Sequence, residues 1–98
     1  MSQKTKMEAL YDTADKFINI ANELSQKDTS GGVGAGMRFA AARYSIFEMT
    51  LAGKNLAEEK EAIKEELLRD YTLMLEENLQ AYIRHTEAQN KEKLKVFS

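Results

Sequence analysis

Apolar residues recur along this chain with the three-and-four spacing of amphipathic helices, and one stretch, residues 33–51, shows that spacing on two faces. Steps of three and four place residues on the same side of a helix. Two such series run through the stretch: Val33, Met37, Ala40, Tyr44, Phe47 and Leu51 form the first, and Ala35, Phe39, Ala42, Ile46 and Met49 form the second. They lie on nearly opposite sides, and a helix that is apolar on both sides is typically buried on both. The sequence therefore predicts a central helix that needs more than one neighbour.

A helix is expected on either side of this central one, and the whole chain reads as a single all-α domain over residues 1–98. The spacing predicts helices over about residues 6–26, 31–52 and 56–88, with a frayed tail over about residues 90–98. The first two helices make a hairpin. The third is longer, roughly 45 Å against about 30 Å for the others, so it is expected to overhang the hairpin.

Turn and capping residues separate the three helices. The run Asp-Thr-Ser at residues 28–30 offers a cap for the central helix, followed by two glycines that favour a turn. Gly53 is the expected C-cap of the central helix. Asn55 and Glu58 have the spacing of a capping box, which predicts the start of the third helix.

Composition and charge exclude several classes of protein. The 98 residues are 43% hydrophobic and 31% charged, with a net charge of −2, so the chain is an ordinary globular sequence without the basic character of a nucleic-acid binder. The absence of cysteine excludes a disulfide scaffold and thiolate metal sites. No apolar run has membrane-spanning length and the first residues lack a signal-peptide pattern, so we expect a cytoplasmic protein with no membrane partner.

Two local patterns resemble chemical sites. The glycine-rich run at residues 31–36 looks like a phosphate loop, but such a loop follows a strand and carries a Lys-Ser/Thr pair, and here Met37 and Arg38 stand in those places. A helix-start turn is the favoured interpretation. The single histidine, His85, is preceded three residues earlier by Tyr82, whereas a di-metal helical bundle uses Glu-x-x-His. We therefore predict no metal, no cofactor and no catalytic residues.

Two polar residues lie near the apolar faces. Arg43 lies between the two faces of the central helix, so it is expected to form an ion pair with an acid such as Asp15 or Glu23. The alternative is a small anion pocket made by Arg43 with Tyr44 and Asn22.

The second such residue is Asn78, which lies in the middle of the apolar stripe of the third helix. A single buried asparagine can fix the register and number of partners in a helical assembly. The alternative is that Asn78 lies where the stripe reaches solvent. The sequence leaves both interpretations open.

Three segments carry a family resemblance: RFAAARYSIFE at residues 38–48, FINIANEL at 17–24 and MLEENLQAYI at 74–83. The chain resembles a small family of uncharacterised bacterial all-helical proteins, known as a domain of unknown function, over roughly residues 11–83. The resemblance implies a bacterial helical protein of about this size. It carries no activity, cofactor or catalytic residue over to this chain.

These patterns favour a non-catalytic protein that self-associates, most simply as a dimer, or that interacts with another protein. The residues expected in the interface are Phe39, Ala42, Ile46, Met49, Leu75, Asn78, Leu79 and Tyr82. The alternative is a binder of a small apolar or anionic ligand, held among aromatic side chains between helices with Arg43 orienting an anionic group.

Overall fold

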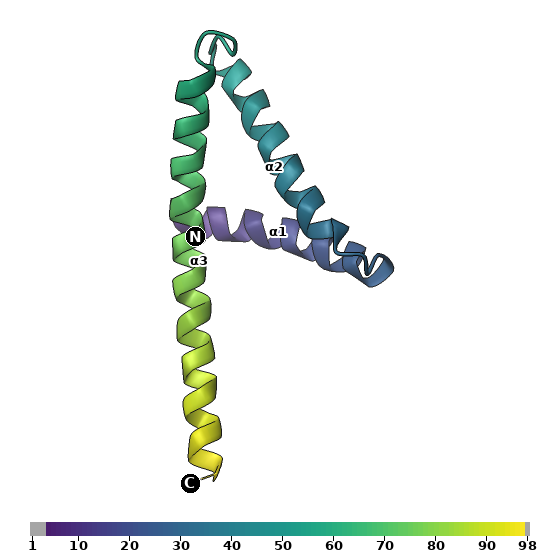
Figure 1. Ribbon diagram of the computed structural model, residues 1–98, viewed down its shortest axis with the longest axis vertical. Coiled ribbons are helices and arrows are strands. Elements are labelled where there is room, and N and C mark those ends of the chain that lie inside the picture. Colours follow the sequence, from purple (N-terminus) through teal and green to yellow (C-terminus); the bar gives the residue numbers. More distant parts are fainter. Residues whose placement is uncertain (1–3, 98) are drawn as a thin grey trace. The chain divides into compact units, whose positions relative to one another are not determined.

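Three helices make up the described structure. The computed structural model describes residues 4–97, with side chains described as far as Glu92. α1 spans Lys6–Lys27, α2 spans Gly32–Leu51 and α3 spans Lys60–Phe97, and no strand occurs over residues 4–97 (Figure 1). The predicted all-α class, with three helices of which the third is the longest, is confirmed.

α1 begins with a capping box that the sequence analysis did not identify. The Glu8 N–H donates to Thr5 Oγ1 at 3.1 Å, and the Thr5 N–H donates to the Glu8 carboxylate at 3.3 Å. This reciprocal pair satisfies two backbone donors that a helix N-terminus otherwise leaves without partners. The Thr-x-x-Glu spacing of Thr5 and Glu8 is itself a sequence signature of a helix start.

The connection from α1 to α2 is built on side chains in the predicted Asp-Thr-Ser-Gly-Gly run. The Ser30 N–H donates to Asp28 Oδ1 at 2.9 Å, and the Gly32 N–H donates to Ser30 Oγ at 3.2 Å. Gly31 between them has a φ of 88°, which favours glycine over every residue with a Cβ. α2 follows at once as the second arm of a hairpin (Figure 1).

α2 ends where the glycine was expected to end it. Gly53 has a φ of 82°, and its N–H donates to the Thr50 carbonyl at 3.0 Å. The Lys54 N–H donates to the Met49 carbonyl at 3.1 Å. These two bonds form a Schellman motif, which satisfies carbonyls that the helix end leaves open.

α3 begins later and ends later than its predicted range of about 56–88. Asn55 Oδ1 does accept the Glu58 N–H at 3.2 Å, but the return bond comes from Glu59, whose carboxylate accepts the Asn55 N–H at 2.7 Å. This bond and an ion pair with Lys54 at 3.8 Å hold Glu59 against a turn, and the helix starts at Lys60.

The other end of α3 also corrects the sequence analysis, which expected a frayed tail over residues 90–98. The helix continues to Phe97, and Ser98 lies outside the described residues. No glycine or proline follows Gly53, and residues 84–93 are mostly good helix formers, so the sequence contains no terminator near residue 88.

The described chain divides into two units, and each is considered by itself. The first reaches residue 48 and contains α1 with most of α2, and the second runs from residue 49 and contains the α2 end, the turn and α3. Among residues 4–92, Ile63 at 4% exposure is the one apolar side chain that is buried. The tightest packing of the second unit is therefore at the start of α3, and the rest of α3 extends from it as a single helix.

The α1–α2 connection gives a pH prediction. Hydrogen bonds from the Ser30 hydroxyl and then from the Ser30 backbone N–H hold the pKa of Asp28 below its ordinary value of 3.8. Because the folded pKa is lowered, the contribution to stability is complete above pH 3.8 and is lost as the pH falls through the folded pKa. A carboxyl ¹³C NMR titration should place the Asp28 pKa below 3.8, and Ser30→Ala should move it back toward that value. An Asp28 pKa at or above 3.8 would contradict this account of the turn.

Candidate functional site

The second apolar series of α2 forms an exposed surface. Phe39, Ala42 and Ile46, which we call the α2 surface, share one side of the helix, and Phe39 and Ile46 are 66% and 38% exposed. The partly buried positions of α2 in the first unit are Val33, Met37 and Ser45, whereas Ala41 between them is exposed. The first unit therefore covers α2 at separate positions and leaves the α2 surface exposed.

A second exposed surface lies on α3. The side chains Leu68, Tyr71, Met74, Leu75, Leu79 and Tyr82 follow steps of three and four along the helix and are all exposed, and we call them the α3 surface. Three residues of the predicted interface, Leu75, Leu79 and Tyr82, belong to this surface. Met49 is the predicted interface residue that is only partly exposed, and its carbonyl accepts the Lys54 N–H at the end of α2.

Polar side chains within the two helices are hydrogen-bonded to their own backbone. Asn78 Nδ2 donates to the Met74 carbonyl at 2.8 Å, and Thr72 Oγ1 donates to the Leu68 carbonyl at 2.8 Å. Asn78 is exposed in the single chain, so the structure agrees with the solvent-facing alternative for one copy. Bonds of this local kind pair the Thr72 hydroxyl proton and one of the two Asn78 amide protons within an otherwise apolar surface.

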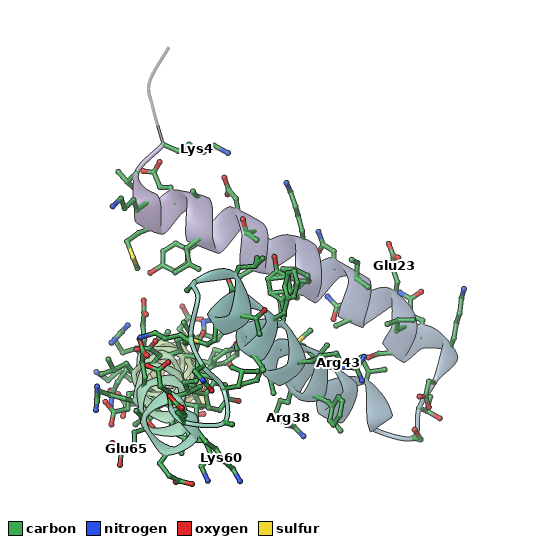
Figure 2. All side chains as sticks on the ribbon, turned by 90° about the horizontal axis from the view of Figure 1, so that it is seen from above. Lys4, Glu23, Arg38, Arg43, Lys60 and Glu65 are labelled. Atoms are coloured by element: carbon green, nitrogen blue, oxygen red, sulfur yellow. The ribbon has the colours of Figure 1, made fainter. Side chains whose placement is uncertain are left out.

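Arg43 has a different partner from the one predicted. Its guanidinium carbon lies 5.0 Å from the centroid of the Phe39 ring, a cation–π contact one helical turn away. Over residues 4–92, no ion pair joins Arg43 to Asp15 or Glu23 and no hydrogen bond joins it to Asn22. Figure 2 shows Glu23 on the side of α1 that faces away from α2. The guanidinium thus lies over a ring four residues earlier on the same helix, and the ion pair with an acid of another helix stays a prediction.

Neither chemical pattern considered in the sequence forms an enclosed site. His85, with Ala81 and Tyr82, lines a depression of about 220 Å³, and all three belong to one helix. A Cβ added to Gly36 would meet no atom within 4 Å, so no backbone of the described chain approaches the glycine-rich run there. Within residues 4–92, no three acidic or histidine side chains gather as metal ligands would.

A helix that crosses a bilayer must be both long and apolar. None of the helices, as far as the structure describes them, combines the length and the apolar character that crossing a bilayer requires.

Comparison with known proteins gives one family. A family model described as a protein of unknown function (DUF3144) matches residues 10–83, which is most of the chain. This match confirms the family resemblance. Neither the curated proteins nor the solved structures contain a significant match.

The Arg43 contact gives a mutational prediction. Cation–π contacts at exposed sites contribute about 0.5–1 kcal/mol, so a double-mutant cycle of Arg43→Gln with Phe39→Leu should give a coupling of that size in the free energy of unfolding. The matched cycle of Arg43→Gln with Asp15→Asn should give a coupling near zero. A larger coupling to Asp15 than to Phe39 would show that the ion pair, and not the ring contact, holds the guanidinium.

Proposed function

We propose that this chain, which belongs to the DUF3144 family of proteins of unknown function, works as a non-catalytic helical module that associates with further copies of itself. The observation that carries this proposal is the exposure of its apolar side chains. Twenty large hydrophobic side chains are exposed among residues 4–92, where Ile63 is the one apolar side chain that is buried.

Exposure on this scale differs from an ordinary protein surface. Single exposed apolar residues are common and carry no information. Contiguous apolar patches, in contrast, mark places where a protein contacts another molecule. The α2 surface and the α3 surface are contiguous because each follows one side of a helix. Two such patches on a chain of 98 residues favour an oligomer over a monomer.

The energetics of an unsupported helix point the same way. An isolated helix is marginally stable in water even with favourable residues, and most helical stability in proteins comes from packing of an apolar face. α3 has 38 residues, about 57 Å at the standard rise, and its buried residue lies in its first turn. Covering the α3 surface supplies the packing that such a long helix needs.

A small-ligand module is the weaker candidate. Ligand pockets are concave and enclose most of the ligand surface. The depression beside His85 is lined by three side chains of one helix. No specific observation favours a ligand there, so self-association remains the proposal. A bacterial and cytoplasmic setting stays a prediction.

Placing a charge in the α2 surface tests the proposal. Light scattering of the purified wild type should give a multiple of 11.1 kDa, the mass of one chain. Ile46→Glu should give monomer or insoluble protein, because association would bury a charge without a partner. Leu79→Glu is a second variant that makes the same test on the α3 surface.

The matched control is Ile20→Glu, which adds the same charge at an isoleucine that is 53% exposed and lies outside both surfaces. The control should keep the wild-type mass. An unchanged mass and melting temperature for both Ile46→Glu and Leu79→Glu would contradict the proposal.

A further inference from the structure

We infer that two copies pair their α3 helices side by side in opposite directions, through the α3 surface. This inference rests on the proposed self-association and specifies which surface meets which. Its occupant is a second copy of this chain, and three observations point to that copy: the charge distribution along α3, the exposed area, and the local hydrogen bonds of the polar residues in the surface.

The charge of α3 changes sign along its length. From Lys60 to Glu77 the sequence has three basic and six acidic residues, a net charge of −3. From Asn78 to Phe97 it has four basic and two acidic residues, a net charge of +2 with histidine neutral. An antiparallel pair places the acidic half of each helix beside the basic half of the other. A parallel pair would place like charges together, which disfavours association.

The helix dipole does not account for this distribution. Acidic residues near an N-terminus and basic residues near a C-terminus stabilise a helix, but this effect is confined to the first and last turns. Glu76 and Glu77 lie more than four turns from Lys60, and Arg69 and Asp70 lie between. The acidic excess therefore extends well into the middle of the helix, beyond the reach of the helix dipole.

The first unit of the same chain offers no matching charge. Residues 4–48 contain six basic and six acidic residues and are neutral. Among the helices of the described chain, α3 is the one whose halves carry opposite net charges. The α3 of a second copy therefore complements it along its whole length. Electrostatic complementarity of this kind selects the orientation of partners more than it adds affinity.

The exposed area suits such a pair. The six side chains of the α3 surface, two of them tyrosines, expose roughly 600 Å² per copy, close to the ~800 Å² that each partner contributes to a standard interface. Thr72 and Asn78 lie within the same stretch and donate to carbonyls of their own helix. Covering the surface would leave the Thr72 hydroxyl proton and one Asn78 amide proton satisfied, which removes a large penalty of burying polar groups.

Distances between spin labels on the full-length chain test the orientation. The chain has no cysteine, so Gln80→Cys and Gln89→Cys each provide one labelling position, and both positions are neutral and exposed on α3. In an antiparallel pair centred where the two halves of α3 meet, between Glu77 and Asn78, the same residue in two copies is separated along the helix axis by twice its distance from the centre. At the standard rise, this separation is about 8 Å at residue 80 and about 35 Å at residue 89.

Double electron–electron resonance measures the long distances, dipolar broadening of the continuous-wave spectrum measures the short ones, and light scattering of the same labelled samples gives their mass. A dimer with a short distance at residue 80 and a long one at residue 89 supports the pairing. A dimer with short distances at both positions, near the 8–10 Å between packed helix axes, overturns the orientation and leaves self-association intact. Long distances at both positions in a dimer overturn the α3 contact. A mass of one chain overturns the pairing and the proposed self-association together.

Discussion

The structure depends on one constraint: an amphipathic helix is stable in water when another element covers its apolar side. α1 and α2 meet this need partly within a hairpin, at the partly buried Val33, Met37 and Ser45 of α2. α3 meets it near its start, where Ile63 is buried and Leu67 is partly buried. The remaining apolar positions of α2 and α3 have a spacing that another helix can cover, and the proposed association with a second copy would cover them.

Helix termini in this chain follow local chemistry and were largely predictable. Gly53 adopts the positive φ that its place after α2 suggested, and the residues 28–30 supply the side-chain acceptors of the first turn. These predictions succeed because capping depends on residues three or four positions apart, which the sequence displays directly. The start of α3 was misjudged because Glu58 and Glu59 compete for one backbone donor at Asn55, and spacing alone does not decide between neighbouring glutamates.

The candidate site was less predictable than the helix termini. The partner of Arg43 depends on where its flexible side chain turns, and here it lies over the ring of Phe39 on the same helix. Which faces of α2 and α3 are apolar could be derived from periodicity. Which molecule covers those faces could not, because periodicity describes one helix and says nothing of its neighbour.

The dependence of thermal unfolding on protein concentration tests the central claim most directly. If a second copy covers the exposed apolar surfaces, folding and association are linked, and the midpoint of unfolding of the wild-type chain rises as the protein concentration is increased. The account predicts such a rise, with mass measured below the transition remaining a multiple of one chain. A midpoint that stays constant over a hundredfold range of concentration, together with the mass of a single chain, would contradict it.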